Sequence, residues 1–312
     1  MNIKNSVLLF ANNINLSFKA MLYRLVVVAV CAGLVVLVVT LNLSVVTESA
    51  QAADFFASIK ATVGGFLTAD FSAFKDISAT YKALMALVGE HIGSVIGASV
   101  GALLIFWAEE FLLGLSYFAM TKVVDGHMSS LKKTGFMEAL FSSFELSMPF
   151  EALYALVKIL LTAITVGLLV FFVAYTIEFL SVFSLVFAMW LLIFIFSAFY
   201  TLTAVSRPSV SDGCGVKTAF ASGYGGKNFW ADFGSFALAF TVSIVVNVLF
   251  FITTFGAGLT ISLPLTSLYF VCLKLVIYYN VKNRKYYIDI DNIVTPVKLR
   301  KDGELLDNVD AQ

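Results

Sequence analysis

Six long runs of apolar residues, separated by shorter polar stretches, dominate this chain of 312 residues. The hydrocarbon core of a bilayer takes about 20 consecutive apolar residues in a helix. By that measure the runs predict membrane spans at residues 22–46, 92–120, 150–177, 179–206, 233–255 and 258–279. We therefore predict an all-α fold, with a polytopic transmembrane domain over residues 1–280 and a cytoplasmic tail at 281–312.

The connection at residues 47–91 is much longer than the other two predicted on the same side of the membrane. Apolar residues recur at helical spacing at 55–59 and at 74–88, and Gly64-Gly65 is expected to separate the two helices. We predict a small outer helical insertion. It is either a lid packed on the bundle or a surface for an external ligand.

An amphipathic pattern precedes the odd-numbered spans. Ile3, Val7 and Phe10 recur at helical spacing before the first span, as do Phe136 and Leu140 before the third. Such helices lie in the membrane interface or pack beneath the bundle. Internal similarity at offsets of 131 and 79 residues relates these stretches. We predict three hairpin units, each preceded by an amphipathic cytoplasmic helix.

Composition supports a membrane location, and charge orients the chain. Hydrophobic residues make up 60% and charged residues 13%, against roughly 25% charged in soluble domains. Most Lys and Arg fall before the first span, after the second and fourth spans, and near the end; Arg24 and Arg207 are counted among them. Because positive residues stay on the cytoplasmic side, we predict a multi-pass cell-membrane protein with both termini cytoplasmic.

The chain offers few residues for metal, disulfide or catalytic chemistry. Cys31 and Cys272 lie inside predicted spans, and the two histidines, His91 and His127, lie on opposite sides of the membrane. No nucleophile motif and no complete phosphate or calcium loop occurs. We expect no catalytic residue, no metal site and no cofactor.

Gly89, Gly93, Gly97 and Gly101 repeat at a spacing of four, which places them on one face of a helix. Glycine removes the side chains that hold helix backbones apart, so a neighbouring helix can approach closely. We interpret this stripe as a helix-packing face within the bundle. A dimer seam or the wall of a transport pathway is the alternative.

Glu109 and Glu110 lie within the second span, where Glu109 is roughly 16 Å from the end at Met120. A carboxylate at that depth costs several kcal/mol unless it is protonated, paired or hydrated. Lys158, inside the third span, is placed to reach one of the two. These three residues are candidates for transport or a proton relay, or they form a structural pair. Lys274 is shallower and is expected to extend to the surface.

The tail carries a strand pattern, because Tyr286, Ile288 and Ile290 alternate with their neighbours until Thr295-Pro296. About 30 residues cannot bury a core alone. The tail is therefore expected to pair with the cytoplasmic loops, with a second copy of the chain or with a partner protein.

The last 70 or so residues contain four short motifs, Lys227-Asn228-Phe229-Trp230, Gly256-Ala257-Gly258, Leu263-Pro264-Leu265 and Tyr278-Tyr279. With these motifs this part of the chain resembles uncharacterised bacterial six-span membrane protein families, including the membrane domain sometimes fused to glycerophosphodiester phosphodiesterases. The phosphodiesterase domain is not found in this sequence, so the resemblance implies no hydrolase chemistry. It implies a protein of the bacterial cytoplasmic membrane.

The leading hypothesis is an integral membrane scaffold or accessory protein that binds partners or lipids through its cytoplasmic helices and tail. Its predicted partners are membrane lipids and a cytoplasmic or membrane protein, with a homo-oligomer as an alternative and no nucleic acid. The second hypothesis is a channel or proton-coupled transporter built on Glu109 and Glu110. No enzymatic activity is predicted, because the sequence shows no catalytic pair or metal cluster.

Overall fold

The computed structural model describes residues 2–68, 74–142, 144–176, 181–221 and 228–295. These residues are almost entirely helical, and six of the described helices are long and apolar enough to cross a membrane. The predicted fold class is confirmed: the chain is an all-α polytopic membrane protein.

The long helices follow the predicted spans in order. They are α2 (Ile14–Thr47), α5 (Ile92–Ser130), α7 (Phe144–Thr176), α8 (Ser181–Leu202), α11 (Phe229–Thr254) and α12 (Leu259–Val281). The fourth apolar segment continues from α8 into the short helix α9 (Ser206–Ser211). Both α2 and α5 extend beyond the predicted spans, because helical structure continues past the end of the apolar run.

A short helix precedes the first long helix of each predicted hairpin: α1 (Asn2–Asn12), α6 (Phe136–Ser142) and α10 (Val216–Ala221). The face that α1 buries is not its apolar stripe. Asn5, Ser6 and Leu9 are buried, whereas Val7 is 47% exposed. The reason is that Asn5 and its neighbours on α1 bond to polar groups near the other end of the chain, which draws the polar face inward.

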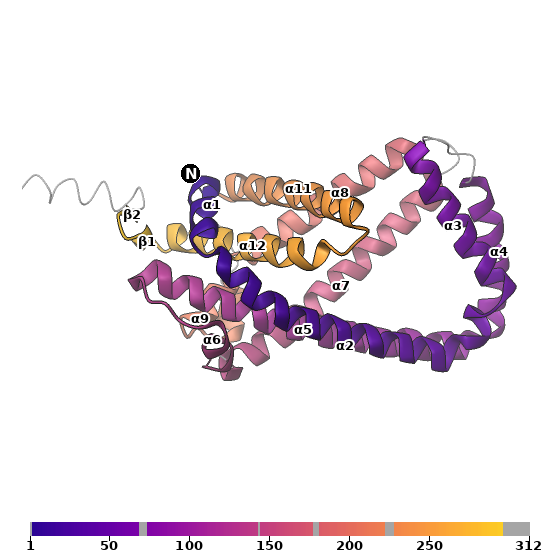
Figure 1. The fold of residues 1–312 in the computed structure, drawn as a ribbon, viewed down its shortest axis with the longest axis horizontal. Helices are drawn as coiled ribbons and strands as arrows, with labels where there is room; N and C mark the ends of the chain where they lie inside the picture. The colour runs from indigo at the N-terminus through magenta and orange to yellow at the C-terminus, as the bar shows by residue number, and fades with distance from the viewer. Residues whose placement is uncertain (1, 69–73, 143, 177–180, 222–227, 296–312) are drawn as a thin grey trace, which may run out of the picture. The chain divides into compact units, whose positions relative to one another are not determined.

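Contacts divide the chain into two compact units, Met1–Val27 with Glu110–Gln312, and Val28–Glu109. In the first unit α12 is the central helix, because it is the most buried of the six candidate spans. Helices α1, α9 and α11 pack against it, and α11 runs alongside it in Figure 1. The buried core of this unit lies around the second half of α12, from Leu268 to Tyr279.

In the second unit, α3 (Ala50–Thr68) and α4 (Phe74–Glu90) form the predicted helical insertion and pack on each other. Ser58 and Thr80 share a hydrogen bond of 3.0 Å between the two helices. The expected break at Gly64-Gly65 is wrong, because both glycines lie inside α3. A glycine inside a helix costs only about 1 kcal/mol, which packing can offset.

The tail forms an antiparallel hairpin of β1 (Tyr286–Asp289) and β2 (Asn292–Val294), so the predicted strand reverses at residues 289–292. The hairpin pairs with the chain's own helices. The Asn5 side chain donates to the Tyr286 hydroxyl at 2.9 Å, and the Asn12 side chain donates to the Ile288 carbonyl at 2.9 Å. Burial raises the pKa of Tyr286, although the bond from Asn5 opposes that effect.

Candidate functional site

On each of α5 and α7, three residues recur at a spacing that puts them on one side of the helix, and all of them except one glycine are polar. On α5 they are Glu110, Gly114 and Tyr117, at relative positions 0, 4 and 7. On α7 they are Glu151, Tyr154 and Lys158, at relative positions 0, 3 and 7. Two helical turns separate the outer members of each set, so the three residues of a set lie on the same side of their helix.

One other helix repeats this arrangement, and the fourth apolar segment contributes two further residues. Ser267, Val271 and Lys274 share one side of α12, at relative positions 0, 4 and 7. Tyr200 near the end of α8 and Arg207 in α9 belong to the fourth apolar segment. The sequence analysis counts Arg207 among the basic residues that follow the fourth span, but only 5% of it is exposed.

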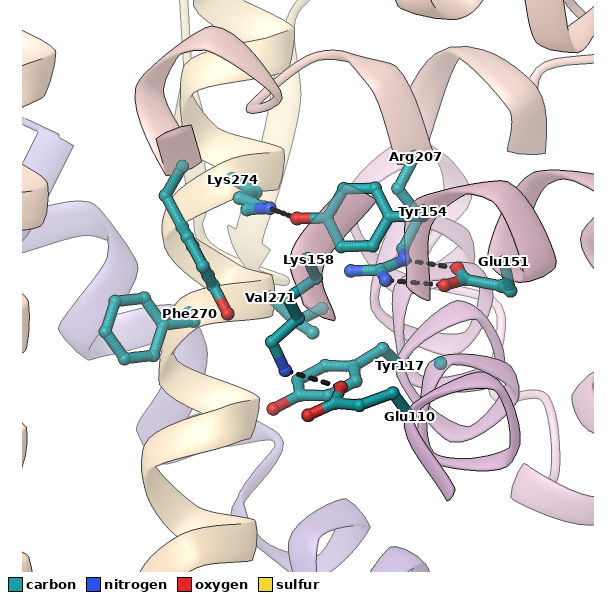
Figure 2. A pocket seen from close by; sticks show the side chains of 11 residues that line it. Glu110, Tyr117, Glu151, Tyr154, Lys158, Arg207, Phe270, Val271 and Lys274 are labelled. Carbon is teal, nitrogen blue, oxygen red and sulfur yellow. Dashed lines mark hydrogen bonds and ion pairs between the residues drawn. The ribbon is translucent and has the colours of Figure 1, made fainter. Parts of the chain in front are cut away.

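These segments meet around a small cavity with a volume of about 10 Å³, which is room for about one water molecule. Figure 2 shows how the charged and aromatic side chains converge on it. The cavity is lined by Glu110, Gly114, Tyr117, Glu151, Tyr154, Lys158, Tyr200, Arg207, Phe270, Val271 and Lys274.

Two ion pairs join the helices at this cavity. The Arg207 guanidinium donates two hydrogen bonds to the Glu151 carboxylate, at 2.6 and 2.8 Å. The Lys158 ammonium donates to Glu110 Oε2 at 2.6 Å. Both side chains of the first pair are almost inaccessible, at 6% and 1% exposed, whereas those of the second are 20% and 29% exposed. The Arg207–Glu151 pair is therefore the deeply buried one.

Tyrosines surround the remaining cations. The Lys274 ammonium donates to the Tyr154 hydroxyl at 3.2 Å and lies 4.2 Å from the centre of the Tyr200 ring. Arg24 of α2 lies 4.3 Å from the centre of the Tyr117 ring. Aromatic faces attract cations, so these rings compensate part of the buried positive charge.

Gly114 makes room for the Arg207–Glu151 pair. A Cβ atom at this position would lie 2.5 Å from Glu151 Oε2 and 3.2 Å from Glu151 Cβ. Contacts this short force a neighbour to move, so only glycine lets α5 pack this closely on the Glu151 side chain.

The structure brings together two of the residues that the sequence singled out, Glu110 and Lys158. Glu109 belongs to the second unit and does not line the cavity. A Cβ atom at Gly101 would touch Val38 at 3.0 Å, and one at Gly97 would lie 3.7 Å from Asn42. Gly89 and Gly93, by contrast, have no atom of the described chain within 4 Å of such a Cβ atom.

Sequence analysis missed four residues of the cluster, Arg24, Glu151, Arg207 and Lys274. The expectation that Lys274 extends to the surface is wrong, since its side chain is held against two tyrosines and the residue is 4% exposed. All four lie near the ends of apolar runs, where charge is common. The spacing of two helical turns, which links Glu151 to Lys158 and Lys274 to Ser267, is the signal that could have identified two of these four, Glu151 and Lys274.

Within the described ranges, no group of three or more His, Cys, Asp and Glu side chains gathers at a geometry that holds a metal ion. Comparison with protein-family models, with curated proteins and with solved structures finds no match to this chain. The resemblance of its last 70 or so residues to six-span bacterial families therefore stays a prediction.

Proposed function

We propose that this integral membrane protein carries a small charged solute across the membrane and binds it at the cavity between the ion pairs. The observation that supports this most strongly is the convergence of six ionisable side chains in an otherwise apolar bundle. Charged groups within membrane segments are costly, and they commonly belong to ion and substrate pathways. The proposal involves no enzymatic step.

The two ion pairs suit different tasks in such a carrier. Glu151 and Arg207 are nearly inaccessible and doubly hydrogen-bonded, which suits a fixed element that holds α7 against α9. Glu110 and Lys158 make a single hydrogen bond and are about a quarter exposed. A solute charge can replace either partner of this looser pair, and that exchange is the step at which binding would change the helix arrangement.

The test is flux into liposomes that contain the purified protein, with gradients of protons, sodium, potassium and chloride applied in turn. We expect Glu110→Gln and Lys158→Met to reduce flux by at least about tenfold, while the protein still folds. Glu109→Gln tests the neighbouring carboxylate, and Glu138→Gln, an exposed position in α6, is the matched control. If Glu110→Gln and Lys158→Met both retain wild-type flux, the transport proposal fails.

A second candidate function, the scaffold, is favoured by the outer side of the tail hairpin. Ile290 and Ile293 are 71% and 53% exposed, and adjacent exposed apolar side chains are typical of a partner surface. Native mass spectrometry of protein extracted gently from its membrane tests this function. A partner that is bound in a fixed ratio and is lost in the Ile290→Asp variant would support the scaffold function. Detection of the protein without any bound partner would contradict it.

The distribution of basic residues favours a cell-membrane location with both termini in the cytoplasm. Asn2 bonds to Asn280, at the end of α12, through its side-chain oxygen at 2.9 Å. The two ends of the helical bundle therefore share one side of the membrane in this proposal, and the basic connections share it with them.

A further inference from the structure

The charges around the cavity do not balance. The lining contains three cations and two carboxylates, namely Lys158, Arg207, Lys274, Glu110 and Glu151. Each carboxylate is already bonded to one cation at 2.6 Å. The third cation, Lys274, is held by the Tyr154 hydroxyl and by ring faces, and it forms no ion pair within the described residues.

Arg24 adds a fourth cation next to the lining. Its Nε donates to Ser116 at 2.9 Å, and its guanidinium lies on the ring of Tyr117, which itself lines the cavity. Only 7% of Arg24 is exposed, and its Nη2 has no hydrogen-bond partner in the described parts of the chain. A guanidinium does not lose its proton in a protein. This positive charge therefore persists even where Lys274 becomes neutral.

A buried cation without a counter-ion is strongly unfavourable in a medium of low dielectric constant. Aromatic faces offset part of that cost, but a tyrosine ring carries no negative charge. The excess also repels any second cation that would enter the cavity. Arg24 Nη2 has no partner and lies beside the lining residue Tyr117, and Lys274 in the lining has no carboxylate partner among the described residues. From these two observations we infer that this site binds a small monatomic anion of the chloride class.

The size of the cavity selects among anions. A volume of about 10 Å³ holds one sphere the size of a water molecule. A halide is a single atom somewhat larger than that sphere and needs little further room, whereas phosphate, sulfate and carboxylates have several heavy atoms and need much more. The ammonium of Lys274 and the hydroxyl-bearing tyrosines of the lining supply the positive charge and hydrogen-bond donors that a dehydrated halide needs.

The inference rests on the proposed function only where it treats the anion as the transported solute. Binding of the anion is a separate property and can be tested without transport.

The test of binding is thermal unfolding of the full-length protein in detergent. Sodium chloride is titrated against sodium gluconate at constant total salt, since gluconate is too large for the cavity. We expect chloride to raise the unfolding temperature saturably by about 2 °C or more, and bromide to do the same. A temperature that does not change with chloride overturns the inference.

Variants locate the bound ion. Arg24→Gln and Lys274→Met should each abolish the rise in unfolding temperature that chloride causes. Lys133 is an exposed lysine between α5 and α6, and Lys133→Met should leave that rise unchanged. If one variant does not fold, the other decides. If both fold and keep the full rise, the ion binds elsewhere and the inference is overturned.

Flux measurements separate this inference from the proposed function. Suppose that chloride raises the unfolding temperature, that this rise needs Arg24 or Lys274, and that liposomes show no flux. The anion site is then supported and the transport function is contradicted. If the protein carries a cation, Glu110→Gln abolishes that flux and chloride has no effect on the unfolding temperature, then transport is supported and the anion site is contradicted.

Discussion

Arg207 and Glu151 face each other through two parallel hydrogen bonds, although 56 residues separate them in the chain. The pair joins α9 to α7 in the interior of the bundle, where both side chains are almost inaccessible. Bidentate pairing of a guanidinium with a carboxylate fixes both distance and orientation. The two helices are therefore held in one relative position.

Loss of a charge from the Arg207–Glu151 pair should destabilise the protein more than the same loss from Glu110–Lys158. Glu151→Gln leaves a buried guanidinium unpaired, which costs about 3–5 kcal/mol. Glu110→Gln should cost less, because that pair makes a single hydrogen bond and its side chains are less enclosed by the protein. Unfolding in detergent measures both changes. Equal losses of stability in the two variants would contradict the assigned difference in burial.

Gly114→Ala should lower the stability of the bundle by about 1–3 kcal/mol, because its methyl group would overlap the Glu151 side chain. Gly234→Ala in α11 is the matched control, since no atom of the described chain lies within 4 Å of its added Cβ atom. Alanine is the better helix former, so this control should be neutral or slightly stabilised. Comparable unfolding temperatures for the two variants would show that Gly114 is not needed for close packing.

The sequence predicts some residues of this site and not others. Glu110 and Lys158 stand out because they interrupt apolar runs near the middle of a span. Arg207 does not, since it follows the fourth run and precedes Pro208, where a basic residue ordinarily marks the cytoplasmic surface. Its burial depends on α9, a short helix that folds back against α7 and α12, and hydropathy carries no information about that contact.

The fold itself was largely predictable, because a span needs only length and apolar composition. The tail shows the limit of pattern analysis. Alternating residues predicted one strand, but the chain turns at Ile290, whose backbone N–H donates to the Asp289 carboxylate at 2.7 Å. That local bond stabilises a turn, and periodicity does not record it.

Cys214 provides a test of orientation, since it is exposed whereas Cys31 and Cys272 are buried. We expect a membrane-impermeant maleimide to leave intact, right-side-out vesicles unlabelled and to label one thiol once the membrane is opened. The variant Cys214→Ser should lose this labelling. Labelling of Cys214 in sealed right-side-out vesicles would reverse the proposed topology.

Alkaline pH should release the tail hairpin. The folded-state pKa of Tyr286 lies above its unfolded value of about 10, chiefly because of burial. The neutral hydroxyl therefore contributes stability that is complete below about pH 10 and is lost as the pH rises through the folded-state pKa. Hydrogen exchange of the β1 amides measures this loss.

Tyr286→Phe removes the ionisable group and should make the exchange of β1 less dependent on pH above about 10. It should also cost about 1 kcal/mol, because the Asn5 side chain loses its acceptor. Tyr287→Phe, its neighbour on the other face of the strand, is the matched control. Identical alkaline profiles for wild type and Tyr286→Phe would exclude this tyrosine as the titrating group.

The contacts of α1 have a consequence for the order in which the protein is made. Asn2 bonds to Asp232 and Asn5 bonds to Tyr286, so the first helix to leave the ribosome finds its partners 230 to 281 residues later. At about 5–20 residues per second, roughly 10–60 s of synthesis separate the two events. During that interval the polar face of α1 has no partner from its own chain. A chain that stalls before residue 286 therefore leaves Asn5 of α1 without the hydroxyl to which it bonds in the finished protein.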